Sequence, residues 1–157
     1  YLDEDKEVIE LSSKAGRIQL NLNIKKYNDH QVLSDNIISV AEKNNHKIIL
    51  QKNNTKKQFN EVFLEKKSNI TLSLLHDSSG GFGREISIVS PPDKKYYTGY
   101  AGGIKSSNVL NIIKLIEEVN KENISYYIDM ESGVRQNNLF SIEECLKIKE
   151  LIETANS

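Results

Sequence analysis

The amino-acid sequence predicts an α/β fold with a mainly parallel sheet. Two observations lead to this class: about five short strand-like segments alternate with segments of helical periodicity, and polar or glycine residues follow the strands. An open parallel α/β sheet and part of a (β/α)8 barrel both fit, and both collect functional groups at the carboxyl ends of strands. With 157 residues, 38% of them hydrophobic, we expect a single domain over residues 1–157.

The strand segments are marked by apolar runs or by alternation. Residues 17–24 alternate apolar and polar side chains, which fits a half-exposed antiparallel strand or, in a barrel, a strand whose amides point inward. The other expected strands cover residues 46–51, 69–75, 96–101 and 124–130.

Helical periodicity follows most of these strands. Apolar residues recur at intervals of three and four in residues 32–42, 56–67 and 109–122. A last helix is expected to begin at Ser141, because Ser141 and Glu144 have the spacing of a capping box. The acidic residues 1–13 are expected to be a short helix or a loose lead-in. Residues 78–95 form a long connection, either a lid or an exposed loop.

Charge and cysteine content narrow the classes of function. A net charge of −1 gives no basic field for nucleic acid or a membrane surface, so neither is an expected partner. No apolar run is long enough to span a bilayer and no signal peptide is seen. The single cysteine, Cys145, cannot form an internal disulfide and is expected to pack in the last helix. A reducing, cytoplasmic location fits these features.

A binding site is predicted between the strand at residues 96–101 and the helix at residues 109–122. Gly102 and Gly103 follow the strand, and Ser106 and Ser107 precede the helix. Glycines let the main chain approach an anion, and the first N–H groups of a helix have no partner within it. The pattern therefore predicts a phosphate site. The alternative is a tight turn followed by a helix cap.

Three strand ends together resemble a known family. The segments LLHDSSGGFG (74–83), GYAGGIKSSNV (99–109) and IDMESGVR (128–135) are similar, in order and spacing, to the last three strand–loop units of phosphoribosylanthranilate isomerase. The resemblance covers residues 70–155 well and residues 17–67 by their strand–helix rhythm. It implies a TIM (β/α)8 barrel of which this chain supplies about strands 4 to 8. A longer natural protein, or self-association as a homodimer, is then expected to cover the open sheet edge.

The resemblance also implies an activity, an Amadori-type aldose–ketose isomerisation of a phosphorylated sugar in tryptophan biosynthesis. The reaction needs a general acid and a general base but no metal or other cofactor. Asp77 matches the family's acid. The cysteine that serves the family as base has no counterpart here, so the base is unidentified. The residues that match the phosphate site are Gly102, Gly103, Ser106, Ser107, Ser132 and Gly133.

Other polar residues at strand ends are candidates for contacts with the rest of the substrate. These are Asn21, Gln51, Glu131 and Arg135. Glu131 stands where the family has a small serine, so it could bind another part of the substrate, pair with Arg135 or indicate a changed reaction. It shares a strand face with Asp129, but two carboxylates are too few to predict a metal site. His76 is expected to be structural.

Two classes of function follow. The first is a phosphoribosylanthranilate isomerase-like enzyme. The alternative is a non-catalytic relic of such a barrel that binds phosphate or a metabolite, or a protein-interaction domain.

Overall fold

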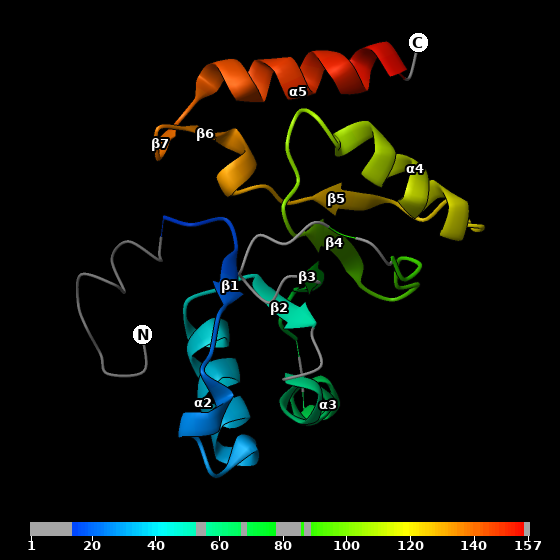
Figure 1. Ribbon diagram of the computed structural model, residues 1–157. Coiled ribbons are helices and arrows are strands. Elements are labelled where there is room, and N and C mark those ends of the chain that lie inside the picture. The colour runs from blue at the N-terminus through cyan, green and yellow to red at the C-terminus, as the bar shows by residue number, and fades with distance from the viewer. Residues whose placement is uncertain (1–13, 53–55, 67–68, 78–85, 87–88, 156–157) are drawn as a thin grey trace. The chain divides into compact units, whose positions relative to one another are not determined.

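The computed structural model describes residues 14–52, 56–66, 69–77, 86 and 89–155, and it has an α/β fold (Figure 1). Five strands are hydrogen-bonded in the chain order β1-β2-β3-β4-β5 in an all-parallel sheet, and β6 and β7 form a separate antiparallel pair. The predicted α/β class with a parallel sheet is thus confirmed, and the arrangement is consistent with the open-sheet alternative. No helix in the described part of the chain is long and apolar enough to cross a membrane.

The chain divides into two compact units, residues 1–75 and residues 76–157, which are described one at a time. The elements of the first unit are β1 (Ile18–Leu20), the 3-10 helix η1 (Ile24–Lys26), α2 (His30–Lys43), β2 (Ile48–Lys52), α3 (Lys57–Lys66) and the start of β3 (Leu72–Asp77). A strand is confirmed within residues 17–24, but it ends at Leu20, and of the two alternatives the antiparallel one was wrong, because β1 pairs with β2 in parallel. The helices expected at residues 32–42 and 56–67 are confirmed to within two residues.

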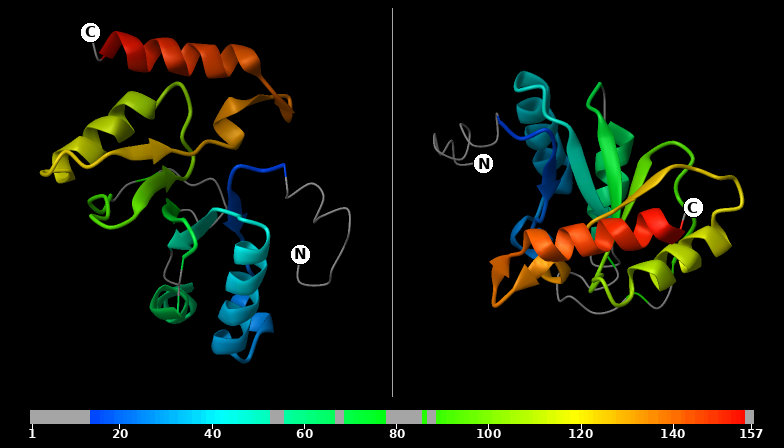
Figure 2. Two further views of the ribbon diagram at one scale, coloured as in Figure 1. Left: turned by 180° about the vertical axis from the view of Figure 1, so that it is seen from behind. Right: turned by 90° about the horizontal axis from the view of Figure 1, so that it is seen from above.

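Helices α2 and α3, seen in Figure 2, supply much of the buried core of the first unit. Residues three and four positions apart on α2 and α3 turn inward, and β2 contributes its alternate side chains. The most buried of these residues are Leu33, Ile37, Ala41, Ile48, Leu50, Phe59 and Phe63. Helix α2 ends at Lys43, one residue after the expected end, with Asn44 as its C-cap, and Asn45 turns the chain with a φ of 53°.

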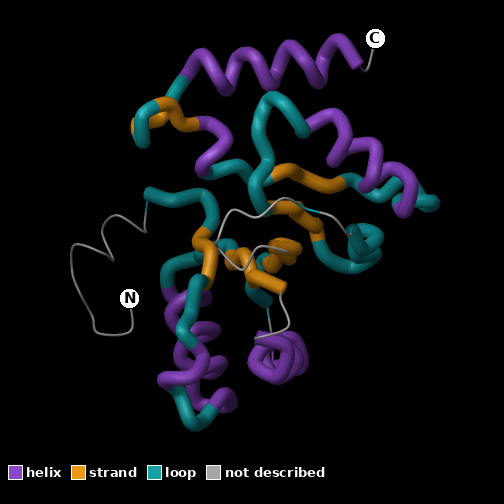
Figure 3. The backbone as a smooth tube through the Cα atoms, viewed as in Figure 1, coloured by secondary structure: helices purple, strands orange, loops and turns teal. Residues whose placement is uncertain are grey.

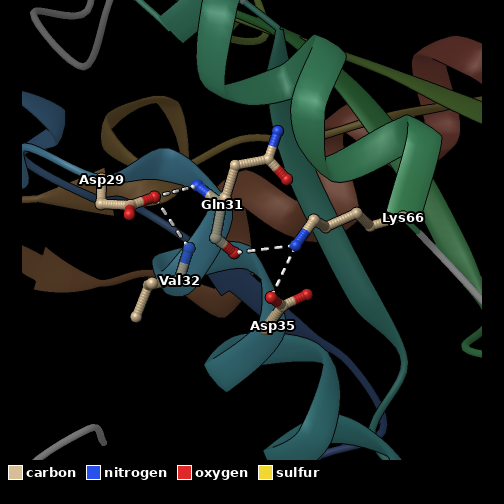
Figure 4. A network of polar contacts seen from close by, with 5 residues as sticks. All are labelled: Asp29, Gln31, Val32, Asp35 and Lys66. Atoms are coloured by element: carbon tan, nitrogen blue, oxygen red, sulfur yellow. Dashed lines mark hydrogen bonds and ion pairs between the residues drawn. The ribbon is translucent and has the colours of Figure 1, made fainter.

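The start of α2 is fixed by a side-chain cap (Figure 4). The Asp29 carboxylate accepts hydrogen bonds from the N–H groups of Gln31, at 2.8 Å, and Val32, at 3.0 Å. From α3, the Lys66 ammonium donates to Asp35 at 2.6 Å and to the Gln31 carbonyl at 3.4 Å. The apolar stripe placed the helix start at residue 32, two residues late, because a cap lies outside the hydrophobic pattern.

The second unit carries the remaining elements, seen as strands and helices in Figure 3. They are β4 (Tyr97–Ala101), α4 (Val109–Val119), β5 (Tyr126–Ile128), the 3-10 helix η3 (Ser132–Val134), β6 (Arg135–Gln136), β7 (Leu139–Phe140) and α5 (Ile142–Ala155). Strands β4 and β5 pair in parallel, with Tyr100 opposite Ile128. The buried core consists of Ile86, Tyr100, Ile104, Val109, Ile112, Ile116 and Ile148.

The end of the second unit contains one element that the sequence analysis missed. Strands β6 and β7 form a short hairpin whose turn residues, Asn137 and Asn138, have φ values of 51° and 65°. The predicted cap of the last helix is confirmed, because the Glu144 N–H donates to the Ser141 hydroxyl at 3.3 Å. The predicted lead-in at residues 1–13 and most of the connection at residues 78–95 lie outside the described residues.

Candidate functional site

The loop that joins β4 to α4 has the backbone geometry that glycine permits. Gly102 has a φ of 126° and Gly103 a φ of 57°, and side chains rarely allow either value. A glycine is therefore needed at position 102, and Gly103 takes a left-handed conformation that only asparagines share elsewhere in the described residues, as the tight-turn alternative holds. The same turn leaves Gly102 and Gly103 partly exposed, and exposed backbone is what an anion site requires.

A buried asparagine holds this loop in shape. The Asn108 side chain donates to the Gly103 carbonyl at 3.0 Å and accepts from the Lys105 N–H at 2.8 Å. Asn108 is the N-cap residue of α4, yet its side chain does not cap the helix. It spans residues 103–105 instead, and it is 7% exposed. Asn108 was not among the predicted site residues and entered only as part of the motif GYAGGIKSSNV. Its place directly before the expected helix could have drawn attention to Asn108, but nothing in the sequence indicated the bridge between Gly103 and Lys105.

Gly133 brings the loop after β5 onto the loop after β4. A Cβ atom at Gly133 would lie 1.8 Å from the Ile104 carbonyl oxygen and 2.9 Å from the Lys105 Cα. The close approach begins at the strand ends, where the Asp129 N–H donates to the Tyr100 carbonyl at 2.9 Å. The two predicted halves of the phosphate site, residues 102–107 and 132–133, therefore meet at backbone contact.

The three predicted serines take different positions. The Ser106 hydroxyl donates to the Glu144 carboxylate at 3.1 Å, and this carboxylate also accepts from the Gln136 amide at 3.2 Å. Ser106 therefore ties the loop to α5. Ser107 and Ser132 are exposed at the surface. Of the three predicted serines, Ser107 and Ser132 are therefore the ones that a ligand in solvent can reach.

Carboxylates gather at the carboxyl ends of β3 and β5. Asp77 ends β3 and is 7% exposed. Burial from solvent raises the pKa of the Asp129 carboxyl above its ordinary value of 3.8, and the negative charges of Glu131 and Asp77 raise it further. The negative charges of Asp77 and Glu131 therefore both act on the Asp129 carboxyl. His76 stacks on Tyr100, with ring centroids 5.5 Å apart, a packing contact of the kind that a structural role predicts.

Glu131 and Arg135 pair with each other, one of the three alternatives for Glu131. The Arg135 guanidinium lies 3.9 Å from the Glu131 carboxylate and also donates to the Asn138 carbonyl at 3.3 Å. Both side chains are exposed, so this ion pair adds little stability. The pair keeps the positive charge of Arg135 at the exposed end of η3.

In the first unit, the structure brings the predicted residues Asn21 and Gln51 together at a lysine. The Lys56 ammonium donates to the Asn21 side-chain oxygen at 3.2 Å and to that of Gln51. The Asn60 amide donates to the Gln51 carbonyl at 3.1 Å. Lys56 is 8% exposed. Lys56 was not among the predicted site residues, and its only signal in the sequence was its place at the start of the helix expected at residues 56–67.

Two further features lie elsewhere in the second unit. Cys145 is half-buried in α5 and has a free thiol, in line with the packing role expected of it. A groove of about 650 Å³ runs between α4, β5 and α5, where Leu110, Tyr127 and Met130 lie among its walls. None of the predicted site residues lines it, so the groove and the predicted phosphate site are separate.

Comparison of the chain with protein-family models, with curated proteins and with solved structures finds no significant match. The assignment of a function therefore rests on the residues described above.

Proposed function

We propose that this chain binds a phosphorylated sugar derivative through residues 102–107 and 131–134 and catalyses an Amadori-type isomerisation with Asp77 as general acid. In this proposal it is the C-terminal part of a (β/α)8 barrel similar to phosphoribosylanthranilate isomerase. The observation that carries the proposal is the contact of Gly133 with the Ile104 carbonyl. That contact sets two strand-end loops beside each other, and barrel phosphate sites are built from two adjacent loops of this kind.

The phosphate would be bound mainly by backbone. The loop after β4 would bind through the partly exposed backbone at Gly102 and Gly103, while the Lys105 N–H is already taken by Asn108. The exposed Lys105 side chain adds a positive charge to the same loop, and the N-terminus of α4 adds its dipole. The exposed Ser107 and Ser132 hydroxyls would complete the shell.

The proposed chemistry assigns Asp77 the proton for the sugar ring oxygen. Protonation of that oxygen opens the ring, and a base then removes the proton from C2 so that C1 and C2 exchange oxidation level. The base is not identified among the described residues. The only cysteine, Cys145, lies in α5 and not on a strand. This position of the cysteine favours the second candidate, a domain that binds the phosphorylated sugar without turnover.

The binding claim is tested by titrating the full chain with inorganic phosphate and with ribose 5-phosphate while backbone amides are followed by NMR. We expect saturable shifts at Gly102, Gly103 and Gly133, with Gly16 of the first unit as an internal reference that does not move. A folded protein with no shift at the three glycines would show that these motifs only support the fold.

The catalytic claim needs a separate test, an isomerase assay with phosphoribosylanthranilate. Asp77→Asn should abolish turnover and leave the ribose 5-phosphate titration unchanged, because the acid is lost while the backbone site is kept. Binding without turnover in the unaltered chain would favour the non-catalytic candidate.

A further inference from the structure

Asp77 and Asp129 lie on the same face of the sheet. His76 stacks on Tyr100, and Tyr100 belongs to the core that β4 and β5 share with α4. Because side chains alternate along a strand, Asp77 points to the face opposite His76. Ile128 is the register partner of Tyr100 and packs against the same core, so the next residue, Asp129, also points to the opposite face. Both carboxylates therefore point away from α4.

The two carboxylates also lie at the same edge of the sheet. Asp77 is the last residue of β3, and Asp129 follows β5, where its N–H donates to the Tyr100 carbonyl at 2.9 Å and continues the strand ladder. Strand β4 lies between β3 and β5 and ends at Ala101. Neighbouring strands are about 4.8 Å apart, so Asp77 and Asp129 stand on strands about 10 Å apart. One carboxylate therefore lies on each side of the short Ala101 side chain.

Electrostatics supports this placement. Partial burial, the charge of Glu131 and the charge of Asp77 all raise the pKa of the Asp129 carboxyl. Because the interaction of two charges falls off with distance, the effect of Asp77 agrees with two carboxylates that face each other. A raised pKa makes the Asp129 carboxylate a stronger base, and its side chain is open to solvent, so a ligand can reach it. Glu131, by contrast, is paired with Arg135.

We propose that Asp129 is the general base of the isomerisation and that it acts on the substrate from the side opposite Asp77. The assignment rests on the proposed function, which leaves its base open. A carboxylate then takes the role that a cysteine has in the family that the chain resembles.

The proton transfers balance with these two residues. Asp77 protonates the ring oxygen, and the ring C1–O bond breaks as the nitrogen lone pair forms a C1–N double bond. The Asp129 carboxylate takes the C2 proton, the C2–H electron pair becomes a C1–C2 double bond, and the electrons of the C1–N double bond return to nitrogen. The enol at C2 then loses its hydroxyl proton while C1 gains one, which leaves a ketone. Proton exchange with water restores both carboxyl groups.

Turnover of phosphoribosylanthranilate is the first test. Asp129→Asn should lower kcat at least about 100-fold, the lower end of what a general base contributes, and leave the ribose 5-phosphate titration unchanged. Glu118→Gln is the matched control, since it removes an exposed carboxylate of α4 outside the site, and it should keep full activity.

Two outcomes of this assay contradict the assignment and are distinct from each other. Turnover that Asp129→Asn leaves intact would overturn the assignment of the base while the proposed function stands. An unaltered chain that binds ribose 5-phosphate without turnover would overturn the proposed catalysis, and the base with it.

The second test needs no turnover. Asp77→Asn removes one of the charges that act on Asp129, so the pKa of Asp129 should fall toward its ordinary value of 3.8, as followed by carbon-detected NMR. Glu118→Gln again serves as the control and should leave the pKa of Asp129 unchanged. An unmoved pKa in Asp77→Asn would show that the two carboxylates do not face each other and would overturn the proposal.

Discussion

The N-termini of α2 and α4 show two ways of using a polar residue at the start of a helix. At α2 the Asp29 carboxylate accepts from two first-turn N–H groups, so the helix satisfies its own donors. At α4 the Asn108 side chain bridges Gly103 and Lys105 and does not cap the helix. A carboxylate at α2 repels an anion, while a neutral amide at α4 shapes a loop and leaves the positive end of the helix open to one. The residue at the cap position therefore distinguishes the two helix starts. Asp29 stabilises the start of α2, whereas Asn108 shapes the loop of a candidate binding site at α4.

The largest effect is expected where the two loops of the second unit touch. Gly133→Ala should destabilise the protein by about 3 kcal/mol, because the added methyl group overlaps the Ile104 carbonyl and the backbone must shift. Urea denaturation measures the change. Gly16→Ala is the matched control, since nothing lies within 4 Å of a Cβ at Gly16. Equal stability of the two variants would mean that the loops are not held together at Gly133.

The Asn108 bridge is the next contact to break. Asn108→Ala leaves the Gly103 carbonyl and the Lys105 N–H without their side-chain partner and should cost about 2 kcal/mol. It should also weaken the proposed phosphate binding, because the loop loses the bridge that fixes its shape. Denaturation and the phosphate titration measure the two effects. Unchanged affinity in a destabilised variant would limit Asn108 to a structural role.

The cap of α2 should matter less, and only for stability. Asp29→Ala removes two hydrogen bonds from an exposed helix start and should cost about 1 kcal/mol. Asp29→Asn is the control, since asparagine also caps well and should retain most of the stability. Any effect of Asp29→Ala on the phosphate titration would contradict the contrast between the two helix starts.

The smallest effect concerns how the free energy of unfolding depends on pH through Asp129, which follows β5. Because the pKa of Asp129 is raised in the folded protein, its contribution to stability is complete below about 3.8, its unfolded value, and is lost as pH rises through the folded pKa. Asp129→Asn should therefore match the unaltered protein at low pH and gain relative stability as pH rises. Denaturation at a series of pH values measures this difference.

A second variant separates the causes of the Asp129 shift. Glu131→Gln removes one of the two neighbouring charges and should lower the pKa of Asp129 toward its ordinary value. Carbon-detected NMR titration of the carboxyl group reports this change directly. An unmoved pKa would assign the whole shift to burial and Asp77.

The alternation of strands and helices could be predicted from the sequence, because the spacing of apolar residues reflects which face of each element is buried. It located β4 to within one residue, and it placed the start of α4 at Val109 and the capping serine of α5 at Ser141. It also identified Gly102 and Gly103 as turn residues, since a positive φ is a local requirement. What it could not supply was the direction of β1 or the Asn137–Asn138 hairpin, which depend on strand pairing.

Tertiary structure alone decided which polar residues meet. Ser106 contacts Glu144 across thirty-eight positions of sequence, and Asn21 contacts Lys56 across thirty-five. Neither pair leaves a local pattern, because long-range contacts follow from how the elements pack. The same holds for the contact of Gly133 with Ile104. A single sequence indicates which side chains can do chemistry, whereas packing decides which of them are brought together.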